Sequence, residues 1–233
     1  MTAVSAFTDT WRLLLRAPLL FLTIGLVGYL IIYAAQFLLF GAAAVQLAPG
    51  QDIEISGGSF FTIFIATLVF QLALPQVLSA ILHLAAWDVI AGRRPAIGDH
   101  IKLSVRCLPQ LVLLSMAVGL AVGFGALFLL VPGLYLGAAL SVVIPAIVIG
   151  GAGFGGLGRS WEITAEYRWT ILGGFILVMI SSFAVSSVLL FVAALVGLDV
   201  IAVVLSGAVS LSLLAIFATH VYATLGGSAQ EHA

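Results

Sequence analysis

Six stretches of this 233-residue chain are apolar enough to cross a bilayer, and none of them contains a lysine or an arginine. A helix needs about 20 mostly apolar residues to cross a hydrocarbon core of about 30 Å. The runs are continuous, whereas the strands of a membrane barrel alternate in polarity over segments of about 10 residues. The sequence therefore predicts a single-domain, all-α, polytopic membrane protein with six transmembrane helices forming three hairpins. The expected spans are residues 18–45, 60–90, 109–131, 134–149, 169–196 and 200–222.

Composition excludes the water-soluble classes. Hydrophobic residues make up 63% of the chain and charged residues only 7%, whereas soluble domains carry about 25% charged residues. So few charges cannot cover the exterior of a soluble fold.

All eight lysines and arginines fall in three short clusters on one side of the expected spans. The loops on the other side carry only the acidic residues Asp52, Glu54 and Asp199. Since cytoplasmic loops are enriched in lysine and arginine, we expect a multi-pass plasma-membrane protein with both termini in the cytoplasm. The clusters also form a basic rim that could contact anionic lipid headgroups. The candidate headgroup contacts are Arg12, Arg16, Arg93, Arg94, Lys102, Arg106, Arg159 and Arg168.

Each expected hairpin follows an amphipathic segment that carries cations. We predict interfacial helices over about 5–16, 97–108 and 157–167, because their apolar residues recur at helical spacing on one face. The apolar faces are Phe7, Trp11, Leu14 and Leu15 in the first helix, Ile97, Ile101, Val105 and Leu108 in the second, and Leu157, Trp161 and Ala165 in the third.

The first two amphipathic segments align without a gap, which favours a threefold repeat of an interfacial helix and a hairpin. The alternative is that any short cytoplasmic loop looks basic and amphipathic. The aligned pairs are Asp9 and Asp99, Arg12 and Lys102, and Arg16 and Arg106.

Prolines and glycines predict where the spans bend or turn. Pro75 is expected to kink the second span, since a proline removes one helical hydrogen bond. Pro132-Gly133 predicts a tight turn between the third and fourth spans. Residues 48–58 are rich in turn-forming residues and predict a loop.

Polar residues at membrane depth are candidates for function. Gln71, Gln76 and His83 surround Pro75 in one span, and the last two are seven residues apart on roughly one face. They could line a polar cavity, although hydrogen bonding between helices explains them as well. No Asp, Glu, Lys or Arg lies in the middle of a span, which disfavours an ion-coupled pump. The other polar residues at depth are Gln36, Ser141, Ser181, Ser182, Ser186, Ser187, Ser206, Ser210 and His220.

Glycine patterns allow two interpretations. The motif G-x-G-x-x-G at residues 151–156 resembles a dinucleotide fingerprint, but that fingerprint works between a strand and a helix of a βαβ unit, so we favour a turn. Two small-xxx-small pairs, Gly119/Gly123 and Gly133/Gly137, permit close helix packing. Packing within one monomer is favoured over a homo-oligomer interface.

No arrangement typical of an enzyme or a metal site is present. His83, Asp88, His100, Glu162 and Glu166 form neither a Cys/His ligand cluster nor an H-E-x-x-H motif. We expect no enzymatic activity, no metal or cofactor, and no nucleic-acid partner.

A set of short motifs, most of them in the region 129–172, carries a resemblance to a known family. These are Pro132-Gly133, Pro145-Ala146, Arg159-Ser160-Trp161, Thr164, Trp169 and the opening segment Thr10 to Pro18. With them the chain resembles the bacterial membrane-domain family that includes the YciC-like proteins and the membrane domain of glycerophosphoryl diester phosphodiesterases. The resemblance implies a six-span inner-membrane protein without the separate catalytic domain of the phosphodiesterases. Gly150-Gly151 stands where that family often has a glutamate, and Ala165-Glu166 departs from its usual Arg-Gly.

Two functions are consistent with these patterns. The first is a non-enzymatic membrane protein that organises or senses lipid, or supports envelope assembly, with anionic lipids as partners. The alternative is a small permease whose path is lined by the Pro75 helix.

Overall fold

A computed structural model describes residues 2–46, 57–128 and 130–230 of the chain. Most of the loop expected over residues 48–58, including Asp52 and Glu54, lies outside the described residues. The described residues contain helices and turns but no strand, which confirms the all-α prediction. In chain order the helices are α1 (Ala3–Arg16), α2 (Pro18–Gln46), α3 (Gly57–Ile90), α4 (Ile97–Arg106), α5 (Leu108–Phe128), α6 (Leu130–Ala139), α7 (Val143–Val148), α8 (Gly156–Ile163), α9 (Arg168–Val196) and α10 (Asp199–Gln230).

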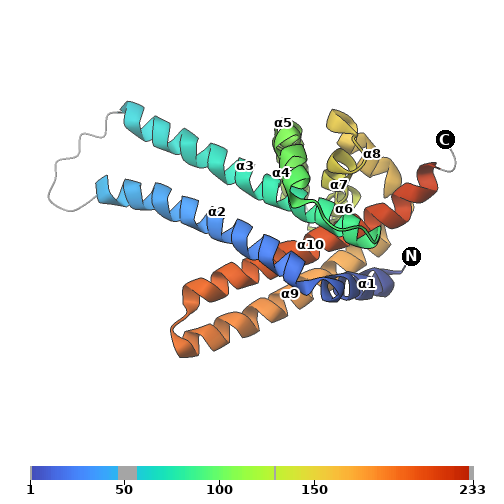
Figure 1. The fold of residues 1–233 in the computed structure, drawn as a ribbon. Coiled ribbons are helices and arrows are strands. Elements are labelled where there is room, and N and C mark those ends of the chain that lie inside the picture. Colours follow the sequence, from blue (N-terminus) through green and yellow to red (C-terminus); the bar gives the residue numbers. More distant parts are fainter. Residues whose placement is uncertain (1, 47–56, 129, 231–233) are drawn as a thin grey trace.

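The long helices form three hairpins, as the sequence predicted: α2 with α3, α5 with α6, and α9 with α10 (Figure 1). Six segments of the described chain are long and apolar enough to cross a membrane. A short helix precedes each hairpin: α1, α4 and α8. α10 continues to Gln230, beyond the expected end of the last span at Tyr222.

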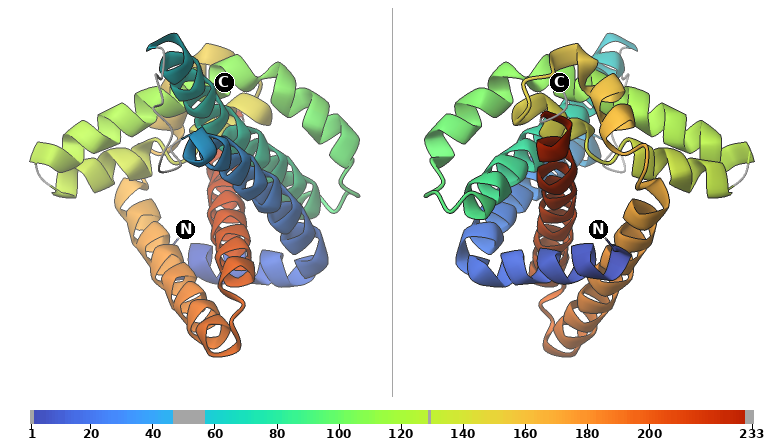
Figure 2. Two further views of the ribbon diagram at one scale, coloured as in Figure 1. Left: turned by 90° about the vertical axis from the view of Figure 1, so that its left-hand side faces the viewer. Right: turned by 90° about the vertical axis from the view of Figure 1, so that its right-hand side faces the viewer.

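The hairpins diverge from a common base instead of forming a parallel bundle (Figures 1 and 2). α10 is the central helix and contacts α2, α3 and α9. Its residues Leu213, Ile216 and Val221 are fully buried and form one core with Phe21 of α2 and Leu82 of α3. Between helices that span a bilayer, such side chains stabilise the fold through van der Waals packing, because lipid tails are as apolar as the side chains themselves.

α1 lies across this base and joins the beginnings of two hairpins (Figure 2). It contacts α9 and α10 and leads directly into α2. Phe7, Trp11 and Leu14 pack against the core, while Leu15 is 68% exposed. Other parts of the protein therefore cover most of the apolar face of α1.

The fourth span is not the single helix expected over residues 134–149, because turns at 140–142 separate α6 from α7. Pro145 explains the break: its ring would clash with the carbonyl of Ser141 in a continuous helix. The position of the predicted turn at Pro132-Gly133 is also wrong, since both residues lie in the first turn of α6. A proline is tolerated there because the amides of the first turn have no helical partner. Pro75, in contrast, lies inside the continuous helix α3.

The glycine-rich segment turns the chain between α7 and α8, as favoured from the sequence: a turn at residue 150 leads into a single 3-10 turn, η1 (Gly153–Gly155), and Gly156 begins α8. Gly151 and Gly153 have φ of 62° and 53°, values that side chains disfavour. The element directly before this segment is the helix α7 and not a strand, so the context of a dinucleotide fingerprint is missing here.

Candidate functional site

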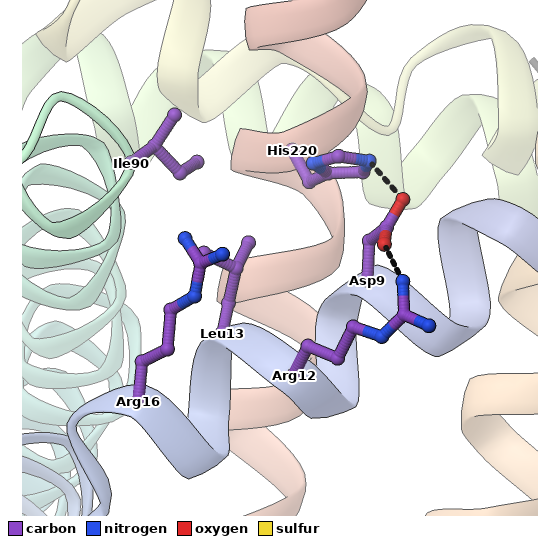
Figure 3. Close-up of a pocket in the computed structure, with 6 residues that line it drawn as sticks. All are labelled: Asp9, Arg12, Leu13, Arg16, Ile90 and His220. Atoms are coloured by element: carbon purple, nitrogen blue, oxygen red, sulfur yellow. Dashed lines mark hydrogen bonds and ion pairs between the residues drawn. The ribbon is translucent and has the colours of Figure 1, made fainter.

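A cavity of about 240 Å³ lies where α1 passes the end of α3 and the last part of α10 (Figure 3). Four residues of α1 line it at spacings of three or four, so they project from one side of the helix. Its volume is below the usual range of about 300–1,000 Å³ for whole ligands, so it suits a headgroup-sized ligand. The lining residues are Asp9, Arg12, Leu13, Arg16, Ile90 and His220.

The cavity contains more positively charged side chains than negatively charged ones. Asp9 lies between two partners, Arg12 at 3.2 Å and His220 Nε2 at 3.6 Å. Arg16 forms no ion pair with any described residue, and its guanidinium points toward the Ile90 side of the cavity (Figure 3). Two guanidinium groups against one carboxylate leave an excess of positive charge. The site can therefore attract an anion, and guanidinium forks suit phosphate geometry.

Apart from Arg168, the other cations of the basic rim divide into two groups. Three of the five form an ion pair with an acidic residue of the chain, which lowers their capacity for an external anion. Arg94 and Arg106 have no ion pair within the described part of the chain. The paired cations are Arg93 with Asp88 (2.9 Å), Lys102 with Asp99 (3.6 Å) and Arg159 with Glu162 (3.9 Å).

Arg168 is enclosed by aromatic side chains at the start of α9. Its guanidinium carbon lies 3.8 Å from the centre of the Trp161 ring and 5.3 Å from that of Tyr135. It also donates hydrogen bonds to the Tyr135 hydroxyl (2.7 Å) and the Trp161 carbonyl (3.1 Å). Trp169 packs on Tyr135 as well. Arg168 thus links α6, α8 and α9.

Replacing Arg168 with lysine should lower the free energy of unfolding by about 1–3 kcal/mol, since an ammonium can neither stack as a guanidinium does nor form the same pair of bonds. Chemical unfolding in a mild detergent measures this loss. Arg94→Lys, at an exposed position without an ion pair among the described residues, is the control. Equal stability of the two variants would show that the enclosure contributes nothing.

Gln71, Gln76 and His83, the three candidates for a polar cavity, each form a hydrogen bond with another residue of the chain. Gln71 accepts a hydrogen bond from Gln36 at 3.0 Å, and Gln76 accepts one from Ser115 at 2.9 Å. His83 is only 4% exposed, and its Nδ1 donates to the carbonyl of Ser79 at 2.6 Å. The bonds of Gln71 and Gln76 join α3 to neighbouring helices, as in the structural alternative considered from the sequence, whereas the bond of His83 stays within α3.

Hydroxyl groups at membrane depth converge elsewhere, between α2, α9 and α10. Two hollows of about 350 and 240 Å³ share Ser186, Ser210 and Leu214. Ser182 donates to Ser210 at 2.7 Å, and Tyr29 lines the larger hollow. The sequence marked these serines as polar residues at depth but contained no signal that they meet.

The two glycine pairs have different environments. Gly133 faces the backbone of α5: a Cβ placed on it would lie 2.6 Å from the amide nitrogen of Ala126. A Cβ on Gly137 would lie 4.0 Å from Val122, whereas Gly119 and Gly123 face open space. Gly133 therefore serves packing within the chain.

No group of three or more potential metal-binding side chains occurs among the described residues. Asp9 and His220 belong to the candidate site, but the sequence did not place them there, because they are far apart along the chain. Comparisons with protein-family models, characterised proteins and solved structures find no match for this chain.

Proposed function

We propose that this protein is a non-enzymatic integral membrane protein that binds anionic lipid headgroups in the cavity between α1, α3 and α10. The single observation that supports this function is Arg16, a guanidinium without an ion-pair partner among the described residues, in the same cavity as Arg12 and His220. A lipid phosphate group could bind between the guanidinium groups of Arg12 and Arg16, with the acyl chains of that lipid following the apolar surfaces of the neighbouring spans.

The same proposal includes the orientation in the membrane. Both termini lie at one end of the molecule, while the α2–α3 and α9–α10 hairpins extend away from it (Figure 1). With the basic rim in the cytoplasm of a plasma membrane, the cavity would face the cytoplasmic leaflet, where anionic lipids attract cations. A relationship to the YciC-like membrane domains is consistent with this arrangement and stays part of the proposal.

The permease alternative has weaker support. Gln76 and His83, which would line a path along the Pro75 helix, each use a polar atom for a bond inside the bundle. The lipid-binding function requires no such path.

The double variant Arg12→Gln/Arg16→Gln tests the proposed site. Each cation near a membrane surface contributes about 1 kcal/mol, so the loss of both should weaken binding of anionic lipid by about 2 kcal/mol, or roughly 30-fold. Native mass spectrometry of protein released from nanodiscs with phosphatidylglycerol measures the bound lipid.

Arg94→Gln/Arg106→Gln is the matched control, because it removes the same charge outside the cavity. Equal losses of bound lipid in the two double variants would mean that the whole basic rim attracts anionic lipid diffusely and that the cavity is not a defined site. Displacement of the lipid by inorganic phosphate would instead identify a site for the free anion.

Asp9→Asn should strengthen the binding of anionic lipid, because the Asp9 carboxylate competes for Arg12 and His220 at 3.2 and 3.6 Å. The size of the side chain is retained and one negative charge is removed. The same measurement of bound lipid shows whether this variant binds anionic lipid more strongly or more weakly. Weaker binding by this variant would mean that Asp9 positions Arg12 for the ligand instead of competing with it.

A further inference from the structure

α4 buries polar side chains and exposes apolar ones, the reverse of a helix in a soluble protein. His100 is 8% exposed and Ser104 is fully buried, and the two lie one turn apart. Ile101 and Val105, also one turn apart, are 44% and 54% exposed. Of the apolar residues expected to share a face, Ile101 and Val105 therefore face outward from the protein, while Ile97 and Leu108 are half-buried.

An acidic residue at the end of α3 holds α4 in this orientation. His100 Nε2 donates to Asp88 Oδ2 at 2.9 Å, and Arg93 contacts the other carboxylate oxygen at 2.9 Å. The His100 and Asp88 side chains are only 10% and 13% exposed. Charge-assisted bonds that are shielded from water are the strong ones, so Asp88 can keep the polar face of α4 turned inward. We call Asp88, Arg93 and His100 the α4 clasp.

The position of α4 in the chain determines what can cover its apolar face. α3 and α5 immediately before and after it are both candidate spans, so α4 lies at a membrane boundary. Lys102, with an 83% exposed side chain, and Arg106 project from another side of the same helix. An apolar stripe flanked by cations is typical of a helix that lies in the interface of an anionic membrane.

We propose that Ile97, Ile101 and Val105 form a membrane-docking face that inserts into the headgroup–acyl boundary of an anionic leaflet. The α4 clasp is the positioning device that turns this face toward lipid. α1 differs, since its corresponding face packs mainly on α9 and α10. This docking face is separate from the cavity that contains Arg12 and Arg16.

Site-specific fluorescent labels on the full-length protein in nanodiscs test the docking face. In a Cys107→Ser background, Ile101→Cys places a label on the apolar stripe, and Asp99→Cys places one on the other side of α4. Lipids that carry a spin label near the headgroup should quench the label at 101 several-fold more than the label at 99. Aqueous iodide should show the opposite preference.

Adding His100→Ala should make the label at 101 accessible to iodide, because the clasp loses its buried donor. A label at Met116→Cys, on the exposed side of α5, reports whether the neighbouring span stays in the bilayer. The Arg12→Gln/Arg16→Gln variant should leave both quenching patterns unchanged, which separates this test from that of the cavity.

Two outcomes would overturn the docking face, and a third would overturn the role of the α4 clasp. Equal access of iodide to both labels would mean that α4 stands free in water. Protection of the label at 101 from both quenchers would mean that protein covers it, and cross-linking between copies would identify a second chain. An unchanged pattern in His100→Ala would remove the role of the clasp.

Discussion

Replacing Gly133 with valine is expected to destabilise the protein by about 1–3 kcal/mol or more, because α6 then can no longer approach α5. A Cβ at this position would lie 2.6 Å from the amide nitrogen and 2.7 Å from the Cα of Ala126. These are backbone atoms, so no side-chain rotation relieves the clash, and the helices must separate. Chemical unfolding in detergent measures the change in the free energy of unfolding.

Gly119→Val and Gly123→Val are matched controls for this substitution. Both glycines lie in α5 and face open space, so valine there makes the same exchange of side chain in a helix without the clash. We expect their stability to stay close to that of the wild type. If all three variants unfold alike, the close approach at Gly133 is energetically unimportant.

The same controls test self-association. A loss of oligomers in Gly119→Val or Gly123→Val, at unchanged stability, would show that this open face of α5 binds a second copy. Native mass spectrometry in detergent measures the oligomeric state.

The double variant Ser160→Ala/Thr164→Val should destabilise the protein by about 1–3 kcal/mol, because it leaves a buried carbonyl without a partner. α6 ends at Ala139, and the break before α7 frees its carbonyl. Ser160 donates to that carbonyl at 2.9 Å and Thr164 at 3.0 Å, and both side chains are fully buried.

The loss of stability in each single variant should be less than half of the loss in the double variant, since one hydroxyl still donates to the carbonyl of Ala139. The double-mutant cycle should therefore be strongly non-additive. Thr8→Val is the control: Thr8 bonds only to its own helix, at an exposed position. Additive losses from the two single variants would contradict a shared role at Ala139.

This contact also shows why the fourth span could not be predicted from hydropathy. Residues 134–149 are apolar almost throughout, and a hydropathy averaged over them does not show where the backbone hydrogen bonds of a helix are interrupted. Pro145 was the local signal for the break. Its stabilisation, however, depends on Ser160 and Thr164, more than 20 residues away.

The sequence by itself determined the class of the protein, its six candidate spans and its three hairpins. A continuous apolar run crosses a bilayer as a helix, because a helix forms the hydrogen bonds of its backbone groups within the segment itself. The division of the chain into short basic helices and long apolar ones followed from the same local pattern.

Only the tertiary structure decided the role of each cation. Arg16 lines a cavity because α10 brings His220 to α1, whereas Arg168 is enclosed because α6 brings Tyr135 to α9. Both arginines look alike in the sequence, each at the boundary of an apolar span. Their difference comes from neighbours that are distant in the chain, and such pairs are set by helix packing, which local periodicity does not encode.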